Sequence, residues 1–420
     1  MKNVKRYLTA IKVEDFESIL NEIVVDTGII DEIPVIDSLG RTAVKDIKSP
    51  IAVPKFPKSK VDGYAVKSEG TFQASENSPI ALEELGNIEI GTQPNIKINS
   101  KLECAYVPTG GPIPEGADAV VKIEYTTILE RAGKKFVEIS QPVGPGDGMI
   151  PAGADLISGE IITKKGTVFT IPMIGSLSAA GLTNVPAYAR LKVGVFSSGN
   201  ELLEPGEPLT HGKIYDVNSR ILHHLIKRTG SKPVQYGIVP DELSILEDVF
   251  ATALKENDII VCSGGTSKGR GDLMPLLLEK HPELSTYVHG VRIKPGKPLI
   301  FALLDSKPVF ILPGNPTSAM MTFIRLLSPH FKRWNRLPYE TNITKKGILT
   351  ERIYSELGRR ELKAVIFSQP VGQKNTPAIV TPILKGSETI TTLLNANGYI
   401  EIPENVERLE KGDHVEVILF

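Results

Sequence analysis

Cysteine is nearly absent from this sequence of 420 residues, which contains only Cys104 and Cys262. The two lie far apart and outside any Cys-x-x-Cys pattern, so the sequence supports neither a disulfide framework nor a thiolate zinc site. Seven histidines are present, but no two form a His-x-x-x-His pair, and a histidine metal site has little support. This composition is typical of a protein of the reducing cytoplasm, which we expect to be its compartment.

The sequence also lacks an excess of either charge and any long apolar run. Its 48 basic and 49 acidic residues give a net charge of -1. A surface that binds duplex nucleic acid usually leaves a chain basic, so nucleic acid is not expected as the main partner. No stretch approaches the roughly 18 apolar residues of a membrane span, and the charged N-terminal stretch has no signal-peptide apolar core. We therefore predict neither nucleic acid nor a membrane among the partners.

Glycine and proline, in contrast, are abundant, with 37 and 31 residues. Both hydrophobic residues, at 41%, and charged residues, at 23%, have the proportions of a globular protein with sizeable cores. At about 150 residues per domain, the length predicts two to four domains. The excess of glycine and proline therefore indicates many turns and Gly-rich loops within folded domains.

The first part of the chain combines helical segments with a β-rich region. Apolar spacing over residues 13–25 predicts an N-terminal helix, and small and apolar residues over 171–180, closed by Gly181, predict a second helix. Between residues 51 and 150, short β-prone runs alternate with Gly, Pro and Asn turns. These runs are 105–108, 119–125 and 136–139. The pattern predicts a β-rich inserted domain.

From residue 190 onwards, strand, loop and helix alternate as they do in βαβ units. The predicted strands are 191–196, 233–239, 258–262 and 308–312, and the predicted helices are 219–228, 243–255 and 272–280. Parallel strands of this kind are covered on both faces. The sequence therefore predicts a three-layer α/β/α domain with a mainly parallel sheet.

Helical patterns vanish beyond Trp334, and β-prone runs broken by Gly and Pro take their place. The runs are 362–367, 378–383 and 414–419, and they predict a small C-terminal β-barrel. The chain as a whole is predicted to be an α/β multidomain protein. Its expected parts are an elongated N-terminal linker domain (1–50 and 150–186), the inserted β-rich domain (51–149), the α/β domain (187–334) and the C-terminal β-barrel domain (335–420).

Four loops that follow the predicted parallel strands are the first candidates for a ligand site. In a parallel α/β sheet, ligands bind beyond the carboxyl ends of the strands. Glycines there let backbone N–H groups approach an anion, and the start of the next helix adds partial positive charge. The loops are 197–201, 240–241, 263–272 and 313–319. Any one of them alone is equally explained as a Gly-rich turn that serves the fold, but four on one edge predict a phosphate-binding site without a Walker sequence.

Three carboxylates, those of Glu201, Asp241 and Asp272, fall in these loops. A carboxylate about 4 Å from a phosphate would cost roughly 4 kcal/mol at an effective dielectric of 20, and a divalent cation removes the conflict. Because Mg²⁺ binds one or two carboxylates together with phosphate oxygens, Asp241 and Asp272 are candidate metal ligands. The alternative is that both residues merely cap the helices that follow them.

A lysine pair and two Gly-containing turns are further candidates. Lys294 and Lys297 lie on a segment stiffened by Pro and Gly, which suits an oxyanion, although a solvated pair is the simpler interpretation. Asp62 precedes Gly63 in a pattern typical of a hairpin turn, and Thr109 precedes two glycines. On their own, these patterns do not separate a site from an ordinary turn.

Taken together and in this order, these segments resemble the molybdopterin molybdenumtransferase family, the MoeA proteins and the gephyrin E domain, over nearly the whole chain. In the first 220 residues, the shared motifs are S-x-x-D-G-Y-A at 59–65, T-G-x-x-x-P-x-G-A-D at 109–118, S-G-N-E at 198–201 and Y-D-V-N-S at 215–219. They continue with S-G-G-x-S-x-G-x-x-D at 263–272, I-K-P-G-K-P at 293–298, P-G-N-P-x-S-A at 313–319, G-R-R-E at 358–361, G-S at 386–387 and N-A-N-G at 395–398.

The resemblance implies a homodimer that uses Mg²⁺, with molybdate and adenylylated molybdopterin as substrates. The α/β domain would hydrolyse the adenylate, insert molybdate into the dithiolene and release AMP. The adenylyltransferase of the same pathway is a candidate further partner. This activity belongs to a transferase of molybdenum cofactor biosynthesis.

The resemblance also assigns roles by matching position. The catalytic residues would be Asp272, Asp241, Glu201, Asp62 and Thr109, with Asp241 and Asp272 holding the metal. The substrate-binding residues would be Gly264, Gly265, Ser267, Asn218, Lys294, Lys297, Ser318, Arg359 and Ser387. Asp62 and Thr109 would be contributed by the inserted domain of the other subunit. The chemistry agrees, because a molybdate dianion needs fixed cations and hydroxyl donors.

Three other interpretations stay open at this point. A paralogue that prefers tungstate would have the same motifs, because the two oxyanions are tetrahedral and of nearly equal size. An adenylyltransferase resembling the smaller single-domain relatives is opposed by the predicted inserted domain and barrel. A catalytically silent scaffold of the same fold is opposed by the intact residues Asp62, Asp241, Asp272, Lys294 and Lys297.

Overall fold

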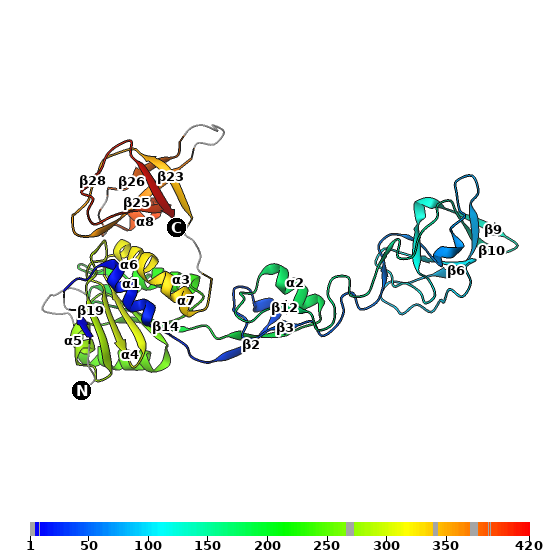
Figure 1. Ribbon diagram of the computed structural model, residues 1–420. Helices are drawn as coiled ribbons and strands as arrows, with labels where there is room; N and C mark the ends of the chain where they lie inside the picture. Colours follow the sequence, from blue (N-terminus) through cyan, green and yellow to red (C-terminus); the bar gives the residue numbers. More distant parts are fainter. Residues whose placement is uncertain are drawn as a thin grey trace. The chain divides into compact units, whose positions relative to one another are not determined.

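The computed structural model divides the chain into two compact units, whose elements are labelled in Figure 1. One unit contains residues 1–31, 40–42 and 187–420, and the other contains residues 32–39 and 43–186. The structure describes residues 5–7, 9–265, 273–338, 343–369, 377–384, 386 and 388–420. The four-part division at residues 50, 149, 186 and 334 stays a prediction.

A seven-stranded sheet forms the centre of the first unit, with the order β1-β19-β21-β22-β18-β14-β17. The pairings of β21 with its neighbours β19 and β22 are antiparallel, and the other pairings are parallel. The strands are β1 (Lys5–Tyr7), β14 (Lys192–Ser198), β17 (Lys232–Val239), β18 (Ile259–Ser263), β19 (Leu284–His289), β21 (Ile300–Leu304) and β22 (Lys307–Leu312). The predicted mainly parallel sheet is confirmed, and β1, β19 and β21 are additional strands that the sequence patterns did not identify.

Helices cover both faces of this sheet, because its strands alternate buried side chains between two apolar clusters. Val193 and Val195 of β14 face the cluster formed with α1 (Val13–Glu22), α3 (Asn218–Arg228), α6 (Pro316–Thr322), the π-helical turn η4 (Phe323–Leu327) and α7 (Ser328–Trp334). Phe196 of the same strand faces the cluster formed with α4 (Leu243–Glu256) and α5 (Leu273–Lys280). The predicted three-layer α/β/α architecture is thus confirmed.

The N-terminal helix α1 packs on the sheet of the first unit. Its residues Phe16 and Leu20 are fully buried in the same cluster as Val193 and Phe301. Residues 1–31 therefore group with the α/β sheet and not with residues 150–186.

The C-terminal region of the first unit is a closed β-barrel. Its strands pair in the order β25-β26-β23-β29-β27, and β27 pairs back with β25 to close the barrel. They are β23 (Thr344–Leu349), β25 (Arg360–Ser368), β26 (Ile379–Pro382), β27 (Gly398–Ile402) and β29 (His414–Leu419). A further two-residue strand, β20 (Ile293–Lys294), comes from the sheet region and pairs in parallel with β25.

The expectation that helices are absent after Trp334 was wrong. A short helix, α8 (Ile390–Asn395), lies between β26 and β27. Six residues are too few for a stable isolated helix, so its formation depends on packing, which sequence periodicity does not report. The barrel itself is confirmed.

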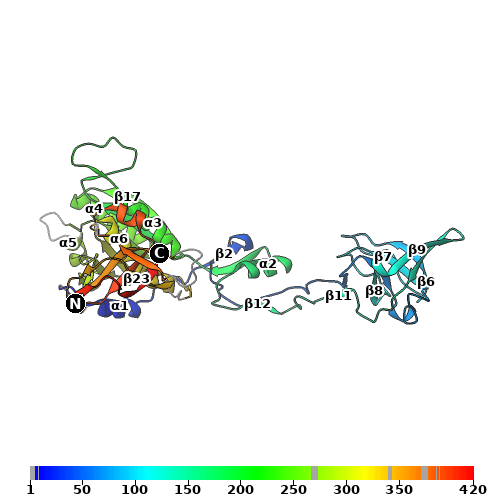
Figure 2. The ribbon, with the colours of Figure 1, turned by 90° about the horizontal axis from the view of Figure 1, so that it is seen from above.

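The second unit contains a six-stranded sheet with the order β8-β5-β7-β6-β10-β9. Its strands are β5 (Gly63–Val66), β6 (Ile80–Asn87), β7 (Glu103–Val107), β8 (Ala119–Lys122), β9 (Thr126–Arg131) and β10 (Lys134–Ile139). Figure 2 gives a second view of this sheet and of the helix α2 (Ile171–Ala179). As predicted, this part of the chain is β-rich, and Gly181 follows α2 with a positive φ of 78°.

Short strands and 3₁₀ turns complete the described chain. They are β2 (Ile30–Pro34), β3 (Ile47–Lys48), β4 (Lys58–Ser59), β11 (Met149–Ile150), β12 (Ile161–Thr163), β13 (Asn184–Tyr188), β15 (Leu202–Leu203), β16 (Ile214–Tyr215), β24 (Ile353–Tyr354), β28 (Arg408–Leu409), η1 (Val35–Asp37), η2 (Ser68–Gly70) and η3 (Ile123–Tyr125).

Candidate functional site

The carboxyl ends of four parallel strands lie along one edge of the α/β sheet. The strands β22, β18, β14 and β17 are consecutive neighbours, and each pair is parallel. The loops after them therefore begin at the same edge, which is where ligands bind in such sheets. We call Ser198, Asn200, Asp241 and Gly264, which lie in these loops, the strand-end edge.

Asp241 links the loops after β14 and β17. The Ser198 hydroxyl donates a hydrogen bond of 2.5 Å to Asp241 Oδ1, and the Asn200 N–H donates one of 3.4 Å to Oδ2. In return, the Asp241 N–H donates to Asn200 Oδ1 at 3.1 Å. The N-cap residue of α4 is Glu242, and no side-chain hydrogen bond caps this helix, so Asp241 does not have the capping role that its position suggests.

Glu201 lies in the same loop, directly after Asn200, and is exposed. Its carboxylate turns back over Gly199, where a Cβ atom would lie 2.7 Å from Glu201 Oε2. Its carbonyl accepts a hydrogen bond of 2.8 Å from the N–H of Ile214, which holds the start of a loop excursion containing β15 and β16. The position of Glu201 is therefore fixed by backbone contacts, and its carboxylate is accessible.

Glycine is required where the loop after β18 passes the loop after β14. Gly264 has a φ of 98°, and a Cβ there would lie 2.2 Å from the carbonyl oxygen of Ser198. No other residue type tolerates this approach together with this backbone conformation. Gly265 follows with a φ of 64°.

Asn218, at the start of α3, connects the loops after β18 and β22. Its Nδ2 donates to Ser263 Oγ at 2.7 Å and to the Gly314 carbonyl at 2.6 Å. The side chain is buried, and within the described residues its Oδ1 has no hydrogen-bond partner. Asn218 therefore holds the two loops in place and retains one free acceptor.

Basic side chains gather in a cavity of about 440 Å³ in the same unit, which we call the cationic pocket. Four residues named from the sequence line it, Lys294, Lys297, Ser318 and Arg359. Lys294 and Lys297 come from the segment around β20, Ser318 comes from α6, and Arg359 comes from the turn before β25. The structure thus brings together residues that are 65 positions apart in the sequence, around one cavity.

Two cations of the pocket are already paired with carboxylates. Lys294 Nζ lies 3.3 Å from Glu361 Oε2, and the two residues are register partners in the β20–β25 ladder. Arg359 Nη1 lies 3.2 Å from Glu356 Oε2. Lys297 is exposed and has no ion pair within the described residues. The pocket therefore presents both paired and free cations.

Sequence reasoning missed two residues of this pocket, Glu361 and Lys363. Glu361 belongs to a recognised motif, and Lys363 follows it by two positions on β25, so strand alternation could have placed both on one face. Burial lowers the pKa of Lys363, with the nearby Lys294 ammonium acting in the same direction and the Glu361 carboxylate opposing it. Asp216 was also missed as a buried partner of Ser197 Oγ, at 3.0 Å, although it lies in the 215–219 motif.

Asp62 and Thr109 lie together in the second unit. The Thr109 N–H donates a hydrogen bond of 2.7 Å to Asp62 Oδ1, in a contact open to solvent. Gly63 begins β5 between two neighbouring strands, and a Cβ there would lie 1.9 Å from the Val121 carbonyl oxygen. The Asp-Gly pair is therefore a strand start and not the hairpin turn that its composition favours.

Three residues named from the sequence, Ser267, Asp272 and Ser387, lie outside the described residues. Within the described residues, no three His, Cys, Asp or Glu side chains gather into a metal-binding group. Of the two metal ligands named from the sequence, Asp241 is the one that lies within the described residues. In that same part, no helix has the length and apolar character needed to span a membrane.

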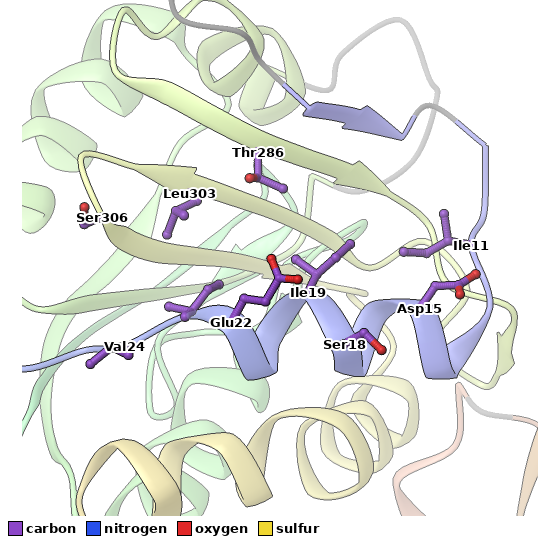
Figure 3. A pocket seen from close by; sticks show the side chains of 10 residues that line it. Ile11, Asp15, Ser18, Ile19, Glu22, Val24, Thr286, Leu303 and Ser306 are labelled. Atoms are coloured by element: carbon purple, nitrogen blue, oxygen red, sulfur yellow. The ribbon is translucent and has the colours of Figure 1, made fainter.

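A second cavity, of about 570 Å³, lies between α1 and the strands β19 and β21. Figure 3 shows Asp15, Ser18 and Glu22 of α1 among the side chains that line it, and Glu22 points toward the strands that carry Thr286 and Leu303. Its charged side chains are carboxylates, and none of the described residues named from the sequence lines it. It is therefore separate from both the strand-end edge and the cationic pocket.

Family comparisons cover most of the chain. Residues 11–181 match the MoeA N-terminal region (domain I and II), residues 194–333 match a probable molybdopterin binding domain, and residues 346–420 match the MoeA C-terminal region (domain IV). The three matches follow the order of the motifs in the sequence.

Individual relatives agree with these matches. A putative molybdopterin biosynthesis protein of Methanocaldococcus jannaschii is 33% identical over 413 residues, covering 96% of this chain and 95% of the relative. The molybdopterin molybdenumtransferase of Bacillus subtilis is 30% identical over 388 residues, covering 91% of this chain and 88% of the relative.

Solved structures give the same result. The crystal structure of the molybdopterin biosynthesis MoeA protein of Pyrococcus horikoshii superposes with a TM-score of 0.81 at 36% identity, covering 98% of this chain and 99% of the other. Similarity in sequence, domain order and fold thus extends over nearly all of the chain. The chain therefore belongs to the MoeA family of molybdopterin molybdenumtransferases, transferases of molybdenum cofactor biosynthesis.

Proposed function

We propose that this protein inserts molybdate into molybdopterin, using adenylylated molybdopterin and Mg²⁺ and releasing AMP. The observation that carries the proposal is the convergence of Lys294, Lys297, Ser318 and Arg359 on one cavity. A tetrahedral dianion is bound well by fixed cations and hydroxyl donors, because charge-assisted hydrogen bonds are the strongest that side chains make. The cationic pocket is the proposed molybdate site.

The strand-end edge is the proposed site of adenylate cleavage. Asp241, Ser198 and Asn200 present carboxylate, hydroxyl and amide oxygens in one place, and oxygen donors are what Mg²⁺ prefers. Each oxygen of Asp241 accepts one hydrogen bond in the structure and retains lone pairs for a cation. With Asp272, Asp241 would hold Mg²⁺, which when bound supplies charge stabilisation on the phosphate oxygens.

The residues of the chain itself position the nucleotide. Gly264 lets the loop after β18 pass close to Ser198, and its N–H already donates to the Leu312 carbonyl at 3.1 Å, so Gly265, which follows it with a positive φ, is the glycine proposed to lie against a phosphate. Asn218 supports this loop through Ser263 and the next loop through Gly314. Glu201, with its accessible carboxylate, and Ser267 would complete the contacts to the metal or the phosphates.

We further propose that the site is shared between two subunits of a homodimer. Asp62 and Thr109 form one hydrogen-bonded pair that is open to solvent on the second unit. The contact uses the Thr109 N–H and one oxygen of Asp62, so the pair can offer further polar groups to a ligand. They would be supplied to the cleft of the other subunit. The adenylyltransferase of the pathway stays a candidate partner, and two buried thiols without a disulfide suit the cytoplasm.

AMP release tests the proposed reaction. Purified protein would be mixed with adenylylated molybdopterin, with and without molybdate and with and without Mg²⁺, and AMP would be quantified by chromatography. We expect AMP only when Mg²⁺ is present, together with molybdenum bound to the pterin when molybdate is added. Absence of AMP under all four conditions would overturn the proposal.

A complementation experiment tests the shared site. Asp62→Asn and Asp241→Asn subunits, each inactive alone, would be coexpressed so that mixed dimers form. If each site combines Asp241 of one subunit with Asp62 of its partner, half of the sites in mixed dimers are intact, and about a quarter of the wild-type activity returns. If both residues act within one chain, no activity returns, and the shared site is refuted.

A further inference from the structure

The cationic pocket contains a buried carboxylate as well as cations. Glu361 is only 5% exposed and lines the cavity beside Lys294. Glu356, which pairs with the lining residue Arg359, is exposed and does not itself line the cavity. A carboxylate in the wall of an oxyanion site repels the ligand, so its presence there needs a physical explanation.

The backbone holds Glu361 in place. Its strand β25 is paired on one side with β20, where Lys294 is its register partner, and on the other with β27, where Ile402 is its partner. Its Oε2 is buried and has no hydrogen-bond partner within the described residues, and the Lys294 ammonium lies 3.3 Å from it as an ion pair. The carboxylate is therefore tied to Lys294 and is not free to turn toward solvent.

Glu361 also lies close to Lys363, which lines the same cavity. Its carboxylate favours the charged form of Lys363, opposing the burial that lowers the pKa of that lysine. One buried carboxylate thus interacts with two of the cations that an incoming oxyanion would use. In the absence of an anion, it takes the place of the ligand.

We propose that the carboxylate of Glu361 competes with molybdate for the Lys294 ammonium. Lys294 pairs with Glu361 when no anion is bound and with molybdate when molybdate is bound. The inference rests on the proposed function, because it concerns the pocket assigned there to molybdate. A competitor of this kind keeps the affinity for molybdate low. A low affinity suits an anion that must leave its site for the dithiolene, whereas permanent binding would trap it.

The sign and the size of the effect follow from charge. Gln has nearly the shape of Glu and keeps a polar oxygen beside Lys294, but it removes one negative charge. The electrostatic energy of a ligand scales with its own charge, so a dianion gains twice the free energy that a monoanion gains. Perrhenate, a tetrahedral monoanion of similar size, therefore serves as a matched probe beside molybdate.

Calorimetric titration of the full-length protein with each anion tests the inference. We expect Glu361→Gln to lower the Kd for molybdate about tenfold and that for perrhenate about threefold, the square root of the first factor. Glu356→Gln should lower the Kd for molybdate about twofold, because its exposed charge is screened. Glu410→Gln makes the same charge change on the barrel, in a pair with Arg352, and should leave both Kd values unchanged.

The outcomes separate this inference from the proposed function. An unchanged or weaker affinity for molybdate in Glu361→Gln, or an equal factor for the two anions, overturns the competitor role while the pocket stays assigned. If Glu361→Gln does not fold, Glu361→Asp, which keeps the charge but draws it away from Lys294, is titrated instead, and a failure to tighten molybdate binding overturns the inference. If the wild-type protein binds no molybdate, the assignment of the pocket itself is wrong.

Discussion

The strand-end edge and the cationic pocket belong to the same compact unit and are built in different ways. At the strand-end edge, Asp241 is held by a hydroxyl and a backbone N–H group from a neighbouring loop of a single sheet. The cationic pocket joins Lys294 and Ser318 of the sheet region to Arg359 of the barrel region. One site thus depends on a local arrangement of neighbouring loops, and the other depends on the docking of two substructures.

The difference also concerns charge. Within the described residues, the hydrogen bonds to Asp241 come from uncharged donors, which leaves its carboxylate ready for a metal. In the pocket, Lys294 and Arg359 have carboxylates beside them, so a ligand must compete for both. A substitution should therefore affect one site without the other, and variants that change a single site test this independence.

The largest effect is expected from Asp241→Asn. The substitution keeps the shape of the side chain and removes the charge that would hold the metal, so AMP release should fall about 10²- to 10³-fold. The calorimetric Kd for molybdate should stay within about twofold of the wild-type value, because its site lies elsewhere. If Asp241→Asn also weakened molybdate binding, the two sites would not be independent and would form a single continuous site.

The second prediction concerns stability alone. Burial lowers the pKa of His330 to about 4, from an ordinary value of 6.5, and the charges of Arg333 and Arg325 act in the same direction. Between these pH values the unfolded chain binds a proton that the folded protein does not, so stability falls as the pH falls from 6.5 to about 4. The expected loss is about 3 kcal/mol.

Urea unfolding at several pH values measures this loss. In His330→Phe, which keeps an aromatic ring against Trp334, the loss over the same window should be smaller by that amount. At neutral pH, His330→Phe should leave both AMP release and the Kd for molybdate unchanged. An identical acid dependence in the variant would show that other groups account for it.

The third prediction separates the free cations of the pocket from the paired ones. Lys297→Gln removes a cation that has no carboxylate partner within the described residues, and the Kd for molybdate should rise about thirtyfold, as expected for a lost charge-assisted hydrogen bond. Lys411→Gln, on the exposed β28–β29 turn, is the matched control. AMP release without molybdate should be unaffected in both variants.

The smallest effect is expected from the arginine next to Arg359. Arg360 does not line the pocket, and instead pairs with Glu14 of α1 and with Glu401 of β27, the latter at 2.9 Å. Arg360→Gln should therefore lower the free energy of unfolding by about 1 kcal/mol and leave the Kd for molybdate unchanged. Arg359→Gln should raise the Kd for molybdate and leave the free energy of unfolding unchanged. If instead Arg360→Gln weakens molybdate binding and Arg359→Gln does not, the pocket residue is Arg360.

Much of the fold could be predicted because local patterns and long-range contacts agree. The four parallel strands have apolar runs of strand length, and the Gly-rich loops after them mark the edge where they end. Three strands of the sheet, β1, β19 and β21, were not predicted from the sequence. The segment Lys5–Tyr7 is short and charged, and it is a strand only because β19 provides a parallel partner from a distant part of the chain.

The site shows the same limit. The resemblance of the motifs to a known family named the cations Lys294, Lys297 and Arg359, which composition alone did not separate from solvated side chains, and all three line the pocket. They did not predict that Glu361 pairs with Lys294, since this contact arises from the register of β20 against β25. Sequence patterns report which groups are present, and only the packing reports which of them neutralise one another.

The two-residue strand β20 has a consequence for how the protein can be shortened. Its partner β25 belongs to the barrel, so the backbone ladder that orients Lys294 exists only when the barrel is present. A chain ending before residue 335 would keep Lys294 but lose β25, the strand whose pairing orients it. Amide hydrogen exchange at Lys294 should therefore be slow in the whole protein and fast in the truncated one, because the barrel strand β25 keeps the segment 293–294 of the α/β region in an ordered strand.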